Sequence, residues 1–128
     1  MKVFLGGTCN NSNWRDKLIP MLKIDYFNPV VENWTPDCQK EEIHQRETCD
    51  WVLYTITPKM KGTYSVAEVV DDSNKRPEKC IFCLLETDED LSFDKVELKS
   101  LMAVKTMINK NGARTASSLE EVAKIINQ

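Results

Sequence analysis

The chain lacks any long hydrophobic run, and no stretch approaches the roughly 20 apolar residues that a membrane-spanning helix requires. Its start, MKVFLGGT, is also too short an apolar run for a secretory signal peptide. A basic excess is missing as well, because 17 Lys and Arg residues face 20 Asp and Glu residues and the net charge is −3. A nucleic-acid polymer is bound through a basic surface, so this class of partner is excluded. We expect a cytoplasmic protein with no membrane partner.

Disulfide and metal frameworks are also missing. The five cysteines are Cys9, Cys38, Cys49, Cys80 and Cys83, an odd number that favours reduced thiols in a chain without a secretion signal. Cys80 and Cys83 have the spacing of a redox motif, but their segment KCIFCLLE is typical of a buried strand, in which they point to opposite faces. His44 is the only histidine and no second close cysteine pair exists, so we expect no zinc site. We expect no cofactor either.

The segment from residue 50 to 73, DWVLYTITPKMKGTYSVAEVVDDS, organises the rest of the chain. Residues 51–56 are mostly apolar, β-branched or aromatic, which predicts a buried parallel strand. Pro58 ends this strand, a turn around Gly62 follows, and a helix is expected to start near Ser65. Open α/β sheets bind their ligands in the crevice beyond the carboxyl ends of the strands. This strand, turn and helix are therefore the best candidate for an active site.

Strands and helices are expected to alternate along all 128 residues. The other predicted strands cover residues 2–6, 24–31, 79–85 and 113–116, and the other predicted helices begin at residues 14, 37, 94 and 117. This alternation predicts a mostly parallel sheet with helices on both faces. We expect one flavodoxin-like, Rossmann-like α/β domain spanning residues 1–128, with three layers and a five-stranded sheet of order 2-1-3-4-5.

Several helix starts have a polar residue that can cap the helix, with an acid three positions later that completes a capping box. The predicted boxes are Asn13 with Asp16, Ser65 with Glu68, Asp94 with Glu97, and Ser117 with Glu120, while Asp37 is predicted to cap the second helix. Residues 88–90 form an acidic run that we expect in a solvated loop.

In the predicted sheet order, the loop GGTCNNSN after the first strand faces the turn TPKMKGTYSVAE across one pocket. Gly6, Gly7 and Thr8 would let a ligand approach the backbone, and amides at the next helix start can hold an anion. A tight β–α turn explains the same glycines equally well, and the spacing matches neither a dinucleotide fingerprint nor a P-loop. Trp14 and Arg15 could offer a stacking plane and a charge, or could be a core tryptophan and a solvated arginine.

Glu68 has two interpretations that do not exclude each other. In one it completes the capping box of its helix. In the other it is a nucleophile, kept ionised near the positive end of the helix, that attacks a sugar carbon and forms a covalent glycosyl intermediate. Another base or water would then resolve this intermediate.

The stretches VFLGGTCNNSNWRDKLIPML, NPVVENWTP and WVLYTITPKMKGTYSVAEVVDDS resemble the nucleoside 2-deoxyribosyltransferase superfamily, particularly its small 2-deoxyribosyltransferase-like branch. In that superfamily the glycine loop after the first strand contacts the nucleoside or its phosphate, and a glutamate at a G-T-x-x-x-E-type helix start attacks the anomeric carbon. The resemblance implies the first role for Gly6, Gly7 and Thr8, and the second role for Glu68.

Two departures from the family pattern leave an alternative open. Many members carry an acid six positions before the nucleophile, where this chain has Gly62. Another family acid precedes the central strand, and this chain offers Glu42 or Asp37 for it. The leading hypothesis is an enzyme that cleaves or transfers the N-glycosidic bond of a nucleoside or its 5′-monophosphate. The alternative is a non-catalytic nucleotide-binding or sensing module, and a flavin-binding electron carrier is also compatible with the fold.

Further substrate-binding residues are predicted on the same edge of the sheet. They are Asn33, Trp34, Thr57, Met60, Gly62, Tyr64 and Ser65. Trp34 and Tyr64 could bracket a base or contact the sugar, or could simply pack against neighbouring side chains. The expected partner is therefore a small nucleoside or nucleotide. Because related folds usually assemble, we also expect a homo-oligomer.

Overall fold

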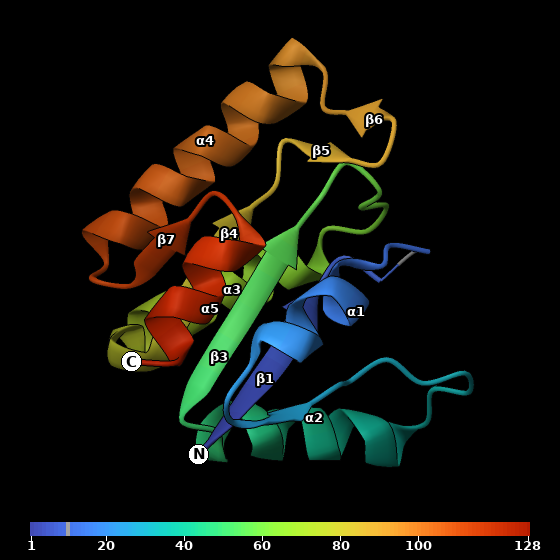
Figure 1. The fold of residues 1–128 in the computed structure, drawn as a ribbon, viewed down its shortest axis with the longest axis vertical. Coiled ribbons are helices and arrows are strands. Elements are labelled where there is room, and N and C mark those ends of the chain that lie inside the picture. The colour runs from blue at the N-terminus through green and yellow to red at the C-terminus, as the bar shows by residue number, and fades with distance from the viewer. Residues whose placement is uncertain (10) are drawn as a thin grey trace.

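The central sheet has five parallel strands in the order β2-β1-β3-β4-β7 (Figure 1). The structure is a computed structural model that describes residues 1–9 and 11–128. Asn10, in the predicted loop after the first strand, lies outside the described residues. The strands are β1 Lys2–Gly7, β2 Asp25–Phe27, β3 Trp51–Ile56, β4 Cys80–Leu84 and β7 Arg114–Ala116. This arrangement confirms the predicted α/β fold and its strand order.

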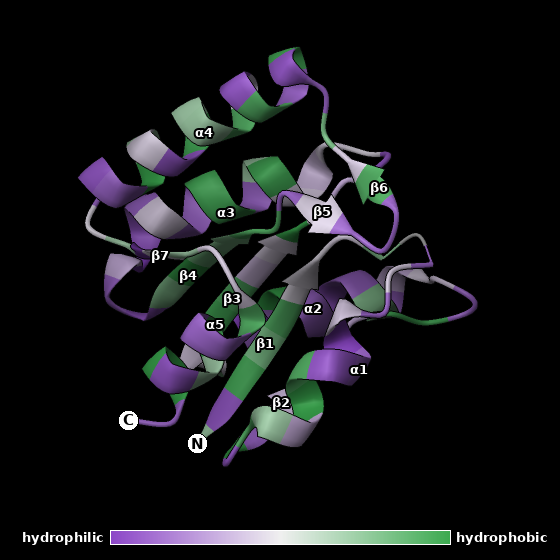
Figure 2. Ribbon diagram, turned by 45° about the horizontal axis from the view of Figure 1, so that its top comes forward, coloured by the Kyte–Doolittle hydropathy of each residue, from purple (hydrophilic) through white to green (hydrophobic). Residues whose placement is uncertain are grey.

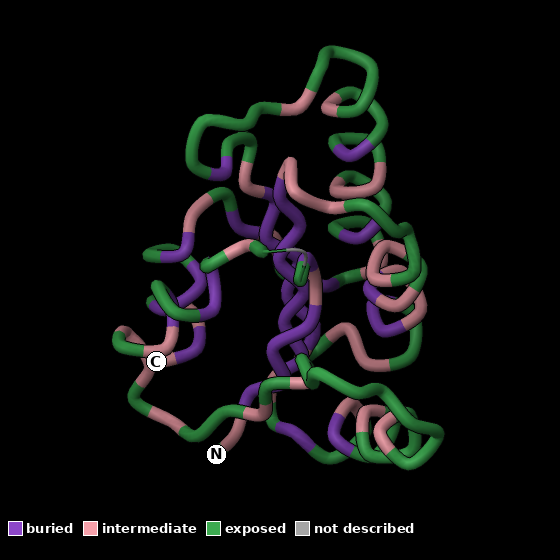
Figure 3. The backbone as a smooth tube through the Cα atoms, turned by 90° about the vertical axis from the view of Figure 1, so that its right-hand side faces the viewer, coloured by how far each residue is buried: buried purple, intermediate pink, exposed green. Residues whose placement is uncertain are grey.

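Helices cover both faces of the sheet (Figure 1). They are α1 Trp14–Leu18, α2 Pro36–Thr48, α3 Tyr64–Lys75, α4 Lys95–Lys110 and α5 Leu119–Ile126, with short 3₁₀ helices at Ile19–Met21 and Pro77–Lys79. The central strands β1, β3 and β4 are the most buried elements, whereas the helices expose polar faces (Figures 2 and 3). None of the described helices has the length and apolar character needed to cross a membrane.

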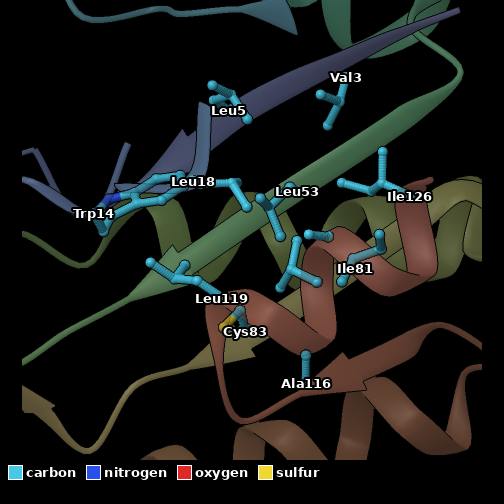
Figure 4. Packing of buried hydrophobic residues seen from close by; sticks show 12 residues of the cluster. Val3, Leu5, Trp14, Leu18, Leu53, Ile81, Cys83, Ala116, Leu119 and Ile126 are labelled. Atoms are coloured by element: carbon cyan, nitrogen blue, oxygen red, sulfur yellow. The ribbon is translucent and has the colours of Figure 1, made fainter. Parts of the chain in front are cut away.

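The alternation of side chains along the strands creates two separate hydrophobic cores, one on each face of the sheet. Leu53 and Ile81 pack with α1 and α5 on one face (Figure 4). Tyr54 and Phe82, their neighbours along the chain, pack with α3 and α4 on the other face. Cys83 lies in the first core and Cys80 in the second. The two thiols therefore occupy opposite faces, as the strand pattern predicted.

Helix α2 contributes no buried hydrophobic side chain to either core. It begins at Pro36 after Thr35, whose hydroxyl oxygen accepts the amide of Cys38 at 3.4 Å, so the cap predicted at Asp37 is wrong. Gln45 is its one buried residue, and the Gln45 side-chain oxygen accepts a hydrogen bond from the Lys2 ammonium at 3.3 Å. Polar contacts, rather than an apolar stripe, therefore hold this helix in place.

Capping was predicted with mixed success. The box of Asp94 with Glu97 is present and confirmed. The last helix has its cap at Ser118 rather than Ser117, with the Ser118 hydroxyl accepting the amide of Glu121 at 3.2 Å. At α1 the side chain of Asn13 makes no capping hydrogen bond, so that box is wrong.

Two segments differ from their predicted extents. Strand β2 covers three residues instead of the predicted 24–31, because its pairing with β1 ends at Phe27 and Pro29 cannot donate to a ladder. The polar connector after β4 contains a small antiparallel hairpin of β5 Thr87–Asp88 and β6 Leu91–Ser92.

Candidate functional site

A cavity of about 340 Å³ lies beside the carboxyl end of β1. Its walls come from Gly6 and Gly7 of β1, from the loop of residues 29–34, from one side of α2 and from the first turns of α3. An adjoining hollow of about 310 Å³ shares Gly7, Cys9, Tyr64 and Ser65 with it. Strands β1 and β3 are neighbours at this edge, so the sheet order brings the glycine loop and the start of α3 together, as predicted.

Close backbone packing explains the glycines of the loop. Gly7 lies opposite Thr55 of β3 and has a positive φ of 115°. A Cβ atom added there would lie 2.1 Å from the Thr55 carbonyl oxygen. At Gly6 an added Cβ would meet the Tyr54 ring at 2.8 Å. Both positions therefore require glycine before any ligand is considered.

The loop after Gly7 is fixed by side chains from α1. The Thr8 carbonyl oxygen accepts the Trp14 indole N–H at 2.7 Å and an Arg15 guanidinium N–H at 2.8 Å. The Thr8 amide donates to the Thr55 carbonyl oxygen at 2.9 Å. This amide is therefore already used by β3 and is not free to hold an anion. Trp14 is buried in the core, which matches the simpler of its two interpretations.

Arg15 lies in the cavity wall with most of its side chain buried. Its Nε donates to the Leu5 carbonyl oxygen at 3.0 Å, and its guanidinium stacks over the Trp14 ring at 4.4 Å. Burial lowers the pKa of Arg15 to about 10. Its described partners are carbonyl oxygens and a ring, and no ion pair of Arg15 is found among the described residues. A cation without a counterion in a cavity wall favours an anionic group of a ligand.

Glu68 projects from the second turn of α3 into the same cavity. The helix cap is Thr63, with no side-chain capping bond, so the capping box predicted for Ser65 and Glu68 is wrong. The Glu68 carboxylate instead forms an ion pair with Arg46 of α2, with Nη1 and Oε2 3.4 Å apart. Burial raises the pKa of Glu68 to about 7, and the charge of Arg46 opposes this shift.

A second carboxylate, that of Glu42 on α2, also lines the cavity. Burial raises its pKa, while Arg46 acts in the opposite direction. Asp37, the other acid considered for this part of the chain, does not line the cavity. Glu42 and Arg46 are four residues apart, and this spacing places both on one side of α2.

The predicted substrate-binding residues divide into three groups. Those lining the main cavity are Gly6, Gly7, Arg15, Trp34, Tyr64 and Ser65, together with Glu68. Those lining only the adjoining hollow are Thr8, Met60 and Gly62. Trp14, Asn33 and Thr57 line neither. Asn33 is exposed, Trp14 is in the core, and Thr57 is buried beneath the hairpin.

Residues 88–90 were predicted to form a solvated acidic run, and this prediction is wrong for Asp88. It is buried, and its carboxylate accepts the Thr57 hydroxyl at 2.7 Å and the Ser12 hydroxyl at 2.6 Å. The carboxylate therefore ties the hairpin both to the end of β3 and to the glycine loop.

Replacing Asp88 with alanine should lower the free energy of unfolding by about 1–3 kcal/mol, because two hydroxyl groups lose their acceptor. Chemical denaturation measures this loss. Asp90→Ala, an exposed position of the same hairpin, is the control and should change stability little. Equal stability of the two variants would contradict the role of Asp88.

No curated protein matches the chain. A family model described as nucleoside 2-deoxyribosyltransferase like matches residues 1–87. The match runs from β1 through β4 and includes every residue that lines the two cavities, with both Glu68 and Glu42. Since it covers well over half of the 128 residues, together with the whole of the described site, the chain belongs to the nucleoside 2-deoxyribosyltransferase-like family.

Proposed function

We propose that the protein cleaves or transfers the N-glycosidic bond of a nucleoside or nucleoside 5′-monophosphate, with Glu68 as the nucleophile. Family membership suggests glycosyl transfer at the nucleoside level. The observation that carries the proposal is the position of the Glu68 carboxylate, in the wall of a cavity that also contains the glycine loop. A carboxylate so placed can reach a sugar whose 5′ end lies toward that loop.

In the first step a Glu68 oxygen bonds to the anomeric carbon while the bond from that carbon to the base nitrogen breaks. The bonding electron pair leaves with the base, and the sugar becomes an ester of Glu68. In the second step water or an acceptor base attacks the same carbon and Glu68 leaves as a carboxylate. Two displacements at one carbon retain its configuration.

The departing base must gain a proton, and Glu42 is suited to supply it. Its carboxyl group lines the cavity, and burial raises its pKa above that of an exposed glutamate, which makes the group easier to protonate. In the second step the same group, now ionised, can accept a proton from water or from the acceptor base.

Replacing Glu42 with glutamine should therefore lower base release by about 10²-fold or more, while Glu68 still reacts.

The remaining cavity residues fit the two ends of such a ligand. Trp34 and Tyr64 line the cavity and stay exposed, which leaves aromatic surface free to stack on a planar base. Arg15 and the hydroxyl of Ser65 lie in the wall near Gly7, where they can hold the 5′ hydroxyl or phosphate.

The test is a chromatographic search for free base. The purified protein is incubated with a panel of nucleosides and 5′-monophosphates, with and without an acceptor base. Base release supports the proposal, and its dependence on the acceptor separates a transferase from a hydrolase. Thermal stabilisation by one of these ligands without base release would instead identify a binding module.

Base release should also depend on pH. The nucleophile must be ionised, and burial raises the pKa of Glu68 to about 7. We therefore expect kcat/KM to rise as Glu68 ionises, with a midpoint near pH 7, and to fall again at higher pH as Glu42 loses the proton that the departing base needs. A profile that is flat from about pH 5 to about pH 9 would contradict an essential Glu68 carboxylate.

We further propose a homo-oligomer. Apolar side chains at the cavity mouth, including Val30, Val31 and Ile43, are exposed in the single chain. A second copy would cover them. Light scattering tests this, and a monomer at all concentrations would contradict it.

A further inference from the structure

A network of buried charges lies next to Glu68, and Arg46 is the member of it that also lines the cavity. Its centre is Asp72 of α3, which is fully buried. The Asp72 carboxylate accepts the Tyr54 hydroxyl of β3 at 2.5 Å and is paired with Arg76, the residue that caps the C-terminal end of α3. It also accepts Arg46 of α2, so the sheet and two helices meet at one carboxylate.

The hydrogen bonds of Arg46 fix the plane of its guanidinium group. Nε lies 3.1 Å from one Asp72 oxygen and Nη2 lies 3.0 Å from the other, which is a two-pronged contact. Nη2 also approaches Asp71 at 3.3 Å. The remaining nitrogen, Nη1, is then directed toward Glu68, at 3.4 Å. The two hydrogen bonds to Asp72 therefore fix the direction in which Arg46 Nη1 points toward Glu68.

The charges around Glu68 explain why this contact matters. Burial raises the pKa of the Glu68 carboxyl most, the charge of Arg46 lowers it, and the charges of Glu42, Asp72 and Asp71 raise it further. Lys75 pairs with Asp71 at 3.1 Å and Arg76 pairs with Asp72, so neither of these cations is paired directly with Glu68 among the described ion pairs. Burial alone would lower the pKa of Arg46, but the hydrogen bonds that Arg46 donates to Asp72 and the surrounding negative charges raise it, so the arginine stays charged.

We propose that Arg46 is a positioning residue, aligned by Asp72, that holds the Glu68 carboxylate as an anion in the cavity wall. The inference rests on the proposed function in so far as Glu68 reacts with the substrate. Arg46 itself lines the same cavity from α2. In this role it couples the polar helix α2, which has no apolar anchor in the core, to the reacting carboxylate.

The test compares Arg46→Met with Arg76→Met. Both variants remove a partner of Asp72, but only Arg46 contacts Glu68. The readout is the titration of the Glu68 carboxyl carbon by NMR, with its signal identified by its absence in Glu68→Gln. We expect the midpoint to rise by about one pH unit or more in Arg46→Met and to stay unchanged in Arg76→Met. An unchanged midpoint in Arg46→Met, or an equal rise in both variants, would overturn the proposal.

The pH dependence of kcat/KM provides a second readout. In Arg46→Met the acidic limb should move to higher pH together with the NMR midpoint. At pH values below the limb, kcat/KM should then fall about tenfold for each pH unit of this shift. If Arg46→Met does not fold, Arg46→Lys replaces it. A lysine keeps the charge, but its single ammonium group cannot bond both oxygens of Asp72 and contact Glu68 at the same time. We therefore expect kcat to fall about tenfold while KM changes little. A wild-type kcat in a folded Arg46→Lys variant would contradict the positioning role.

The NMR titration separates this inference from the proposed function. A shifted midpoint in a protein that releases no base would support the role of Arg46 and refute the enzymatic function. An unshifted midpoint in an active enzyme would refute the role of Arg46 alone.

Discussion

Replacing Glu68 with glutamine should reduce base release by at least about a thousandfold while the protein remains folded. Glutamine has nearly the same shape, but its amide cannot displace a base from the anomeric carbon and cannot leave again as an anion. The measurement is chromatography of free base with the best substrate of the panel. Glu120→Gln, on the exposed side of α5, makes the same chemical change away from the cavity and should retain wild-type activity.

The same variant has a consequence for stability. The pKa of Glu68, about 7 in the folded protein, is raised by burial, so it lies above the value of an unfolded chain. The protonated carboxyl therefore stabilises the fold below the unfolded pKa, and this contribution is lost as the pH rises through about 7. Denaturation of the wild type should show this loss between about pH 5 and about pH 8, and Glu68→Gln should not. Identical pH dependence in both proteins would contradict the buried state of Glu68.

Gly7→Ala should lower the free energy of unfolding by more than about 4 kcal/mol or prevent folding, because its new Cβ collides with backbone atoms. That Cβ would lie 2.1 Å from the Thr55 carbonyl oxygen and 2.6 Å from the Thr55 nitrogen, at a positive φ of 115°. A flexible side chain could move aside, but β3 cannot move without breaking its pairing with β1.

Gly62→Ala is the matched control, because an added Cβ there has no heavy atom within 4 Å. Its stability should stay within about 0.5 kcal/mol of the wild type. Thermal denaturation of the two alanine variants measures the difference. A wild-type transition in Gly7→Ala would show that the contact between β1 and β3 at this point is not as close as described.

The sheet could be predicted because its determinants are local. Apolar strands alternate with helices along the chain, and such alternation permits few topologies, so the order β2-β1-β3-β4-β7 followed directly. The strand order in turn brought the glycine loop and the start of α3 to one edge. The position of Glu68 in the cavity wall could be predicted for the same reason, since its distance from the end of β3 places it in the first turns of a helix at that edge.

The charged part of the site could not be predicted in the same way. Helix α2 is polar on all sides, so its sequence does not indicate which side faces the sheet, and the contact of Arg46 with Glu68 depends on that rotation. Asp88 resembled its exposed neighbours in a run of acids, and its burial depends on the hydroxyls of Thr57 and Ser12, which are distant in sequence. Both cases involve polar partners that only the tertiary structure brings together.

The most direct test of the central claim is to trap the glycosyl ester of Glu68. The protein would be incubated with a nucleoside or 5′-monophosphate whose sugar carries fluorine at C2′, since an electron-withdrawing fluorine slows the steps that pass through an oxocarbenium-like transition state. With a good leaving base, the glycosyl ester of Glu68 should form faster than it breaks down, so that it accumulates. Mass spectrometry should then find one fluorinated sugar per chain, mapped to the peptide that contains Glu68 and absent from Glu68→Gln. Turnover of the natural substrate with the sugar attached to another residue would contradict the mechanism.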